Sequence, residues 1–188
     1  MNLIFLRHGE TIWNRTGRWQ GNTDVPLSET GMEQARKAAE QLKNYKIDCI
    51  FSSDLRRARD TARIVSETIG IGQVMEDRRL RERNLGIMEG KTTEEIKKML
   101  NMDVGIVDIV GKDLPVNGLE SIESQFLRGR EFFNSINGKC ENVLIVSHGV
   151  MIGILLNILT GEDFRYRKIS NCEIIRLENV DMEIDKKI

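Results

Sequence analysis

The chain is poor in the residues that mark disulfide-rich, metal-binding or nucleic-acid-binding proteins. Its 188 residues include only three cysteines and two histidines, and the formal net charge is −1. So small a charge gives no general attraction to nucleic acid or to an anionic membrane, and any anion site must be a local basic pocket. We therefore expect neither nucleic acid nor a membrane among its partners.

Cysteine usage and the absence of long apolar runs bear on the compartment. Cys49, Cys140 and Cys172 are widely spaced and form no C-x-x-C motif, so we expect reduced thiols in the core. The amino-terminal residues show no basic region followed by a cleavage site. The longest apolar stretch, residues 150–159, is too short to span a bilayer. These features predict a cytoplasmic protein.

Composition and pattern predict the fold class. The apolar content of 40% and the charged content of 30% are ordinary for a globular protein, and the length suits a single domain over residues 1–188. No repeat or Pro/Gly-rich linker interrupts it. Strand-like and helix-like segments alternate, which predicts an α/β fold: a three-layer sandwich whose mostly parallel sheet has helices on both faces.

The apolar periodicity places the individual elements. We predict strands near residues 3–6, 49–51, 143–146 and 173–177, and helices near residues 29–44, 54–69, 92–100, 121–136 and 150–159. Ser28 is a good N-cap for the first helix. Residues 77–119 have a looser pattern, which predicts an insertion that caps one end of the sheet, although an irregular connection would look the same. The charged tail from Asn179 is expected to form an edge hairpin or to fray.

Both histidines follow short apolar runs. His8 comes after residues 3–6 (LIFL) within Arg7-His8-Gly9, and His148 comes after residues 143–146 (VLIV) within Ser147-His148-Gly149. Runs of this kind are typical of buried parallel strands. Ligands bind at the carboxyl edge of such sheets. The pattern predicts that the two imidazoles share one pocket.

The first histidine motif suits phosphoryl chemistry. Arg7 and His8 can reach one pocket only if the chain turns after the strand, and Gly9 permits a turn. A guanidinium can hold two phosphate oxygens while an imidazole attacks phosphorus in line. The competing interpretation is a core histidine next to a surface arginine, and the triplet alone favours it.

The second candidate element is an arginine-rich helix start at residues 52–59 (SSDLRRAR). A helix amino terminus offers free amides and a partial positive charge to an anion. Helical spacing points Arg56 to water and leaves Arg57 and Arg59 as candidates beside the apolar stripe. Taken alone, the segment is better explained as a solvated basic helix face.

Glu82 and His148 could supply the remaining chemistry. A leaving alkoxide needs a proton, which a carboxyl group near the site can deliver. Glu82 lies between Arg81 and Arg83, which favour its ionised form, and a salt-bridged surface glutamate is the simpler interpretation. A protonated His148 could stabilise the charge of the transferring phosphoryl group. Two histidines and nearby carboxylates could also bind zinc, but no H-x-H, H-E-x-x-H or cysteine cluster completes a ligand set.

Taken together, these motifs resemble those of the histidine phosphatase superfamily, also called phosphoglycerate-mutase-like. The segments that carry the resemblance keep the family's order over roughly residues 1–160. They are residues 7–11 (RHGET) with Asn14, Gln20-Gly21, residues 26–35, residues 53–62, residues 80–90, and Ser147-His148-Gly149. The resemblance implies the phosphoglycerate-mutase-like fold and a reaction that needs neither metal nor other cofactor.

The resemblance also implies roles for the matched residues. His8 would be the nucleophile that becomes phosphohistidine, and Glu82 would be the general acid and then the base. Arg7, Arg57 and His148 would surround the phosphate, with Asn14, Gln20, Gly21 and Gly149 nearby. The family's arginine directly precedes an alanine, which selects Arg57 over Arg59.

The same family contains mutases and phosphatases. Cofactor-dependent phosphoglycerate mutases are longer and shield the phosphoenzyme, whereas here Glu82 runs directly into residues 84–86 (NLG). We therefore expect a phosphatase of small phosphate monoesters, and residues 80–90 resemble those of α-ribazole phosphatases. Met88 replaces a common aromatic residue and residues 115–121 (PVNGLES) depart from the usual pattern, so substrate identity stays open. The alternatives are a mutase and a non-catalytic phosphate-binding module. Oligomeric state is not predicted.

Overall fold

One mixed sheet forms the centre of the protein. The computed structural model describes residues 1–163 and 167–182. The sheet has the strand order β3-β2-β4-β1-β5. The strands are β1 (Asn2–Arg7), β2 (Cys49–Ser52), β3 (Val74–Glu76), β4 (Asn142–Ser147) and β5 (Ile174–Leu177). The first four are parallel, and β5 runs antiparallel to β1 at the edge. The predicted, mostly parallel sheet is confirmed.

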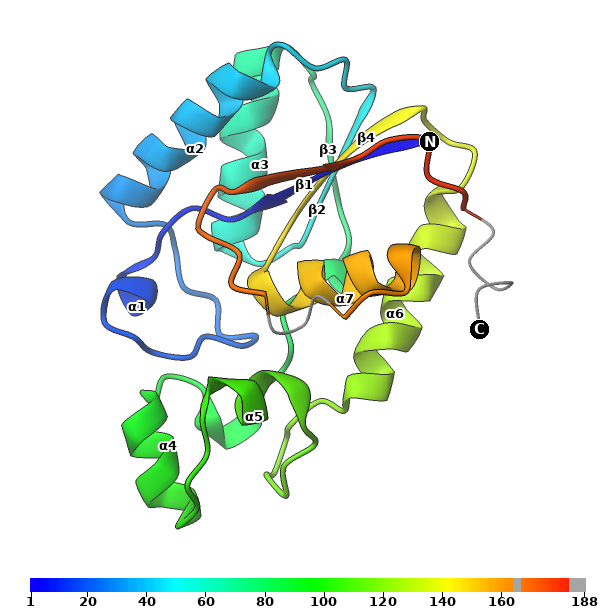
Figure 1. Ribbon diagram of the computed structural model, residues 1–188. Helices are drawn as coiled ribbons and strands as arrows, with labels where there is room; N and C mark the ends of the chain where they lie inside the picture. Colours follow the sequence, from blue (N-terminus) through cyan, green and yellow to red (C-terminus); the bar gives the residue numbers. More distant parts are fainter. Residues whose placement is uncertain (164–166, 183–188) are drawn as a thin grey trace.

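Helices cover both faces of this sheet. Helices α2 (Glu29–Leu42) and α3 (Arg56–Ile69) pack on one face, and α6 (Ile122–Ile136) and α7 (Gly149–Thr160) pack on the other (Figure 1). Because each helix turns an apolar stripe to the sheet, burial of those stripes holds the layers together. The structure therefore has the predicted three-layer α/β arrangement.

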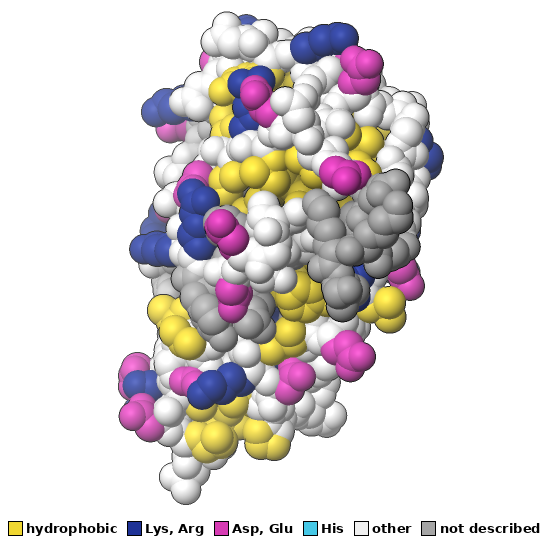
Figure 2. Space-filling view, turned by 45° about the vertical axis from the view of Figure 1, so that its right-hand side comes forward, with side chains coloured by type: hydrophobic (Ala, Val, Ile, Leu, Met, Phe, Trp, Pro, Cys, Tyr) yellow, Lys and Arg dark blue, Asp and Glu magenta, His cyan; other side chains and the backbone are white. Residues whose placement is uncertain are grey.

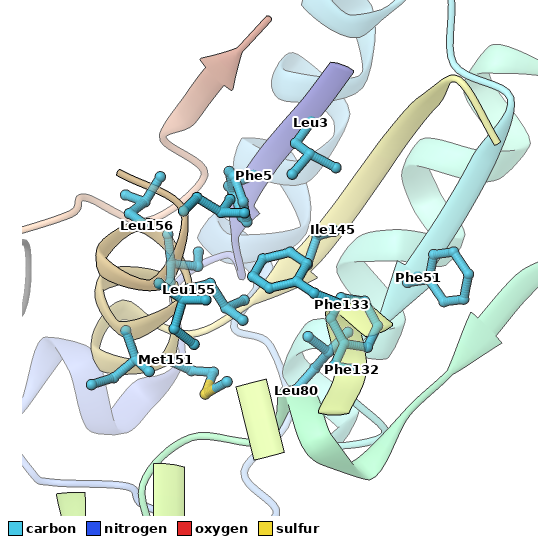
Figure 3. Close-up of a cluster of buried hydrophobic side chains, with 14 of the residues drawn as sticks. Leu3, Phe5, Phe51, Leu80, Phe132, Phe133, Ile145, Met151, Leu155 and Leu156 are labelled. Atoms are coloured by element: carbon cyan, nitrogen blue, oxygen red, sulfur yellow. The ribbon is translucent and has the colours of Figure 1, made fainter. Parts of the chain in front are cut away.

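Two apolar clusters fill the space between the layers. The larger one joins Phe5 of β1 and Ile145 of β4 to Phe132 and Phe133 of α6 and Leu155 of α7 (Figure 3). Helix α7 is buried over most of its length, which explains its almost uniformly apolar sequence. The second cluster lies under α2 and α3 and uses small side chains such as Ala39, Ala58 and Ala62, which let these helices approach the sheet closely.

The 77–119 segment lies beyond the carboxyl edge of the sheet. It contains two short 3-10 helices, η1 (Arg78–Leu80) and η2 (Gly86–Met88), and the helices α4 (Thr93–Leu100) and α5 (Ile106–Gly111). It has an apolar cluster of its own, centred on Met88, Ile96 and Ile109. Figure 1 shows α4 and α5 on the side of α1 (Ile12–Arg15), away from both chain ends. Helix α5 was not predicted, because six residues are too few to show a helical period.

Local side-chain bonds set the helix starts. The hydroxyl of Ser28 accepts a hydrogen bond from the amide of Gly31, as predicted for an N-cap. Helix α3 begins at Arg56, two residues later than predicted. Its expected first residue, Asp54, instead accepts hydrogen bonds from Arg81. That ion pair links the start of α3 to the beginning of the 77–119 segment.

The prediction of three reduced cysteines is wrong in this structure. Cys49 and Cys140 form a disulfide with their Cα atoms 6.3 Å apart, and Cys172 is free. Cys49 starts β2, Cys140 lies just before β4, and these two strands are neighbours in the sheet. Distance along the sequence therefore hid their proximity in space. The pairing removes one support for a cytoplasmic location, which stays a prediction.

The remaining features concern the surface and the tail. Within residues 1–163 and 167–182 no helix is both long enough and apolar enough to cross a membrane. Acidic and basic side chains are interspersed over the face shown in Figure 2, in keeping with the small net charge. The backbones of Met1 and Val180 bond to each other, so the tail follows β1 at least this far. The rest of the predicted hairpin or frayed end, from residue 183, lies outside the described residues.

Candidate active site

The strand register brings the two histidines together. Strands β1 and β4 pair in parallel with Arg7 opposite Ser147, so His8 and His148 leave the sheet side by side. Their ring centroids lie 5.1 Å apart and the ring planes are tilted by 57°. The predicted meeting of the two imidazoles at the carboxyl edge is confirmed.

His8 is held with one ring nitrogen occupied. Its Nδ1 lies 2.7 Å from the carbonyl oxygen of Gly9. Because a carbonyl can only accept, the proton belongs on Nδ1 and the lone pair on Nε2. Burial, followed by the positive charges of Arg57 and Arg7, holds the pKa of His8 well below its usual value. The ring is therefore a neutral imidazole with a nucleophilic Nε2.

His148 is fully buried and is oriented by the second strand. Its Nε2 lies 2.9 Å from the hydroxyl of Ser53, the residue that follows β2. Burial, and then the charge of Arg57, keeps the pKa of His148 well below its usual value. Without a bound anion, these surroundings favour the neutral imidazole. A phosphate dianion beside the ring would favour the proton again.

Two buried guanidinium groups lie beside the imidazoles. Arg57 is fully buried and donates to the carbonyls of Gly21 and Thr23 at 2.7 and 2.8 Å. Arg7 donates to the carbonyl of Ile169. Burial lowers the pKa of Arg57 to about 10, which leaves it charged at neutral pH.

The structure decides among the three arginines at the start of α3. Arg57 lines the cavity with His8 and Arg7. Arg56 is exposed, as predicted. Arg59 lies near Asp60 and Glu76, at 3.7 and 3.9 Å. Arg57 is thus the arginine of this helix that reaches the site, in agreement with the resemblance.

A glycine is required at position 9 for a different physical reason from the one expected. It is not among the glycines with positive φ, so the turn does not require its conformational freedom. A Cβ atom at Gly9 would lie 2.4 Å from the carbonyl oxygen of Gly31. The close approach of the loop to the start of α2 is what excludes a side chain. The hydroxyl of Thr61 in α3 accepts from the Gly9 amide and holds the loop from the other side.

Glu82 lies at the amino terminus of α7. Its carboxylate accepts hydrogen bonds from the amides of Val150 and Met151 at 3.2 and 3.1 Å, and from the amide of Arg83. The first turn of a helix stabilises a carboxylate in this way. The flanking arginines turn elsewhere, Arg81 to Asp54 and Arg83 to Asp113. Neither flanking arginine pairs with Glu82, so the simpler interpretation of Glu82 as a glutamate salt-bridged to them does not hold in this structure.

The other predicted binding residues surround the same space. Asn14, Gln20, Gly21 and Gly149 line one cavity of about 380 Å³ together with Arg7, His8, Arg57 and Glu82. His148 touches His8 but does not itself line this cavity. The amide oxygen of Asn14 accepts from the backbone of Thr11. All the predicted site residues are therefore in one region, with the ring of His148 beside that of His8.

Several buried polar atoms near this cavity have no partner within the described part of the chain. They include Arg7 Nε, Arg57 Nε, His148 Nδ1 and Gln20 Oε1. A buried donor without an acceptor costs about 1–3 kcal/mol, and proteins accept that cost chiefly at functional sites. Three of these four atoms are nitrogens that can donate to an oxyanion. The arrangement can bind a tetrahedral anion between two guanidiniums and an imidazole.

Sequence reasoning missed the residues that support the site. Ser53 was part of the quoted motif, but its bond to His148 could not be foreseen without the sheet order. Glu89 bonds the amides of Asn22 and Leu85. Arg128 of α6 donates to the carbonyl of Glu82 at 3.3 Å and to Glu120. No local sequence signal connects these distant residues.

A mostly parallel α/β sheet with a buried histidine pair and two arginines at its carboxyl edge suits the transfer of a phosphoryl group through a histidine. The family model for the histidine phosphatase superfamily (branch 1) matches residues 3–185. The chain belongs to this superfamily, whose members are phosphatases and mutases. Among the described residues, no three His, Cys, Asp or Glu side chains are close enough to hold a metal ion.

The proteins that are similar to the chain include a probable mutase and phosphatases. "Probable phosphoglycerate mutase GpmB" of Yersinia pestis (strain Pestoides F) is 32% identical over 95% of this chain and 85% of its own length. The mycobacterial glucosyl-3-phosphoglycerate phosphatase Rv2419c, in a complex with VO3, has a TM-score of 0.83 and 32% identity over 94% of this chain and 90% of its own. A "putative alpha-ribazole-5'-P phosphatase" from Escherichia coli K-12 has a TM-score of 0.77 and 25% identity over 88% of this chain and 82% of its own.

Proposed function

We propose that the protein is a phosphoric monoester hydrolase that works through a phosphohistidine on His8. The observation that carries this proposal is the bond from His8 Nδ1 to the Gly9 carbonyl, which leaves Nε2 as a neutral nucleophile beside two guanidiniums. In the first step Nε2 attacks phosphorus and the bond from phosphorus to the ester oxygen breaks. In the second step water attacks the phosphohistidine, inorganic phosphate leaves, and Nε2 regains its lone pair.

The surrounding groups would stabilise the transferring phosphoryl group. The unpartnered donors of Arg7, Arg57 and His148 support this role, because fixed donors in a buried site are worth more than donors in water. Asn14, Gln20, Gly21 and Gly149 would complete the substrate-binding wall. No step requires a metal ion or another cofactor, and metal-independence is part of the proposal.

Glu82 would move the protons. In the first step its carboxyl group would protonate the leaving alkoxide, and in the second it would take a proton from the attacking water. Its position at the start of α7, on the lining of the cavity with His8, supports this assignment.

The substrate of the proposal is a small phosphorylated metabolite, and α-ribazole 5'-phosphate is the specific candidate. The similarity to the Escherichia coli structure supports that candidate. We further propose that the 77–119 segment acts as a cap over the site, and that the protein functions in the cytoplasm. The second candidate function is phosphoglycerate mutase activity, which the identity to the Yersinia relative favours. A non-catalytic phosphate-binding module is disfavoured because His8 and Glu82 are both at the site.

The decisive experiment traps the intermediate. The protein would be mixed with a radiolabelled phosphate monoester and denatured, and acid-labile, base-stable label on the protein would be measured with wild type and His8→Ala. We expect label and phosphate release with wild type and neither with the variant, whose circular dichroism should be unchanged. Wild-type turnover by His8→Ala would exclude the proposed nucleophile. Conversion of one phosphoglycerate into another without release of phosphate would establish the mutase instead.

A further inference from the structure

The cavity that contains His8 has an apolar wall supplied by the 77–119 segment. Ile106, Val107 and Val110 of α5 line it, together with Leu85 and Val150. Ile106 is 63% exposed and Val107 is 55% exposed, whereas Ile109 and Val110, which also line the cavity, are buried. Large exposed apolar side chains grouped at a cavity mark a surface that binds something apolar.

Helix α5 is held firmly in this position. Arg83, which directly follows Glu82, is fully buried and donates to the carbonyls of Ile109 and Lys112 and to the carboxylate of Asp113. Ile109 is also fully buried in the apolar cluster of the 77–119 segment. The exposure of Ile106 and Val107 is therefore not the result of loose packing.

The charged groups of the same wall are mostly committed to partners. Arg18 donates to the carbonyl of Gly90 and to Glu95, and Arg167 pairs with Glu173. Both line the cavity, as does the exposed Lys168. A substrate with a second anionic group would have to compete with Glu95 and Glu173 for the two guanidiniums. Apart from Lys168, the part of the cavity away from Arg7, Arg57 and His8 therefore favours an apolar body over a carboxylate.

We infer that α5 forms a leaving-group subsite that selects phosphate monoesters with an aromatic or branched aliphatic body. This inference rests on the proposed phosphatase function and adds the class of alcohol that is released. Ile106 and Val107 contact that body while Arg7, Arg57 and His8 hold its phosphate. Both side chains act as specificity-determining residues.

The test compares two substrates whose alkoxides are similar leaving groups. The values of kcat/KM for release of phosphate from 2-phenylethyl phosphate and from 2-hydroxyethyl phosphate would be measured with the full chain, with 3-phosphoglycerate as a third substrate. Burial of much of one phenyl ring should favour the phenylethyl ester by about 10–100-fold. A ratio near one, or a preference for 3-phosphoglycerate, would overturn the subsite.

Variants locate the selectivity on α5. The double substitution Ile106→Ala with Val107→Ala should lower the phenylethyl to hydroxyethyl ratio by about 10-fold. Ile87→Ala is the matched control, because Ile87 is 47% exposed on the same segment but does not line the cavity, and its ratio should equal that of wild type. Val107→Thr keeps the side-chain shape and should lower the ratio several-fold. This variant tests whether α5 supplies the selectivity if the double variant does not fold.

The outcomes separate the two proposals. If wild type releases phosphate from both esters but the α5 variants keep its ratio, the leaving-group subsite is wrong and the phosphatase stands. If wild type releases no phosphate from any of the three substrates, and none from other monoesters, the proposed function fails and the subsite fails with it. A fall of the ratio in the α5 variants, with Ile87→Ala unchanged, supports both.

Discussion

The carboxylate of Glu89 lies where a side chain at Gly21 would begin. A Cβ atom at Gly21 would be 2.1 Å from Glu89 Oε1, and Gly21 has a φ of +51°. The same carboxylate oxygen accepts from the amide of Asn22, and the carbonyl of Gly21 accepts from Arg57. Glu89 thus acts on Arg57 through the loop between them and is a positioning residue.

Gly21→Ala should therefore weaken catalysis without removing any catalytic group. The added methyl group would push the loop that contains Gly21 away from Glu89 and displace the Gly21 carbonyl that accepts from Arg57. We therefore expect kcat/KM to fall by about 10–100-fold. Gly17→Ala is the control, since Gly17 also has positive φ but has open space around it. Phosphate-release kinetics and thermal unfolding of both variants would check this. Equal losses in the two variants would show backbone strain alone.

Glu82→Gln should slow turnover according to the leaving group. Loss of the proton donor costs about 10²–10⁴-fold for an alkyl phosphate, whereas p-nitrophenyl phosphate needs little protonation and should lose much less. Val150 and Met151 donate to different oxygens of Glu82, so the single amide oxygen of Gln keeps one of these two bonds, and thermal unfolding of the variant would check that the fold persists. Equal rates for wild type and variant with an alkyl phosphate would exclude Glu82 as the acid.

Ser53→Ala should affect catalysis through His148. The substitution removes the hydroxyl that lies 2.9 Å from His148 Nε2 and leaves that buried nitrogen without a partner, so we expect kcat to fall by about 10-fold or more. Ser53→Thr should restore part of the loss because it keeps the hydroxyl. The pH profile of kcat is the readout that a purely structural role would not move. An unchanged profile in Ser53→Ala would contradict the positioning role.

The two buried histidines should make the fold sensitive to acid. The pKa values of His8 and His148 are lowered in the folded protein, mainly by burial and then by Arg57. Below about pH 6.5 the unfolded chain therefore binds more protons than the folded one. The free energy of unfolding then falls with decreasing pH, by up to about 1.4 kcal/mol per pH unit for each histidine.

Urea unfolding between pH 7.5 and pH 5 would check this dependence. Above pH 6.5 the histidines stay neutral in both the folded and the unfolded protein. Their contribution to the free energy of unfolding should therefore not change with pH there. His148→Gln removes one of the two groups and should reduce the slope between pH 6.5 and pH 5, while the carboxylates titrate alike in both proteins. Identical slopes for wild type and His148→Gln would show that His148 is not held neutral in the fold.

Local patterns in the sequence were sufficient for most of the fold. The apolar runs before His8 and His148 were read correctly as parallel strands, because a buried strand needs little beyond a short, β-branched apolar segment. The helices with a strong apolar stripe, such as α2, were also placed to within a few residues. The short helix α5 was missed because six residues are too few to show a helical periodicity.

The candidate site, like the fold, could be predicted only in part. That the two histidines meet could be predicted, because motifs at strand ends converge whenever the strands are parallel neighbours, and the resemblance to the family supplied the other candidate residues. The bonds that set their states could not be predicted, since each joins distant parts of the chain. Ser53 reaches His148 only because β2 lies next to β4. Cys49 and Cys140 meet for the same reason, which a count of intervening residues could not reveal.

The amino-acid sequence by itself determined the α/β class and the strand ends at which the two histidines lie. These follow from burial and periodicity, which act over a few neighbouring residues, whereas the resemblance to the family was needed to select the other candidate site residues, such as Arg57 over Arg59. Only the tertiary structure decided the tautomer of His8, the low proton affinity of His148, the carboxylate contacts of Glu82 and the apolar wall from α5. Those properties depend on burial and on charges brought together across the sheet edge, and such long-range proximity exists only once the chain has folded.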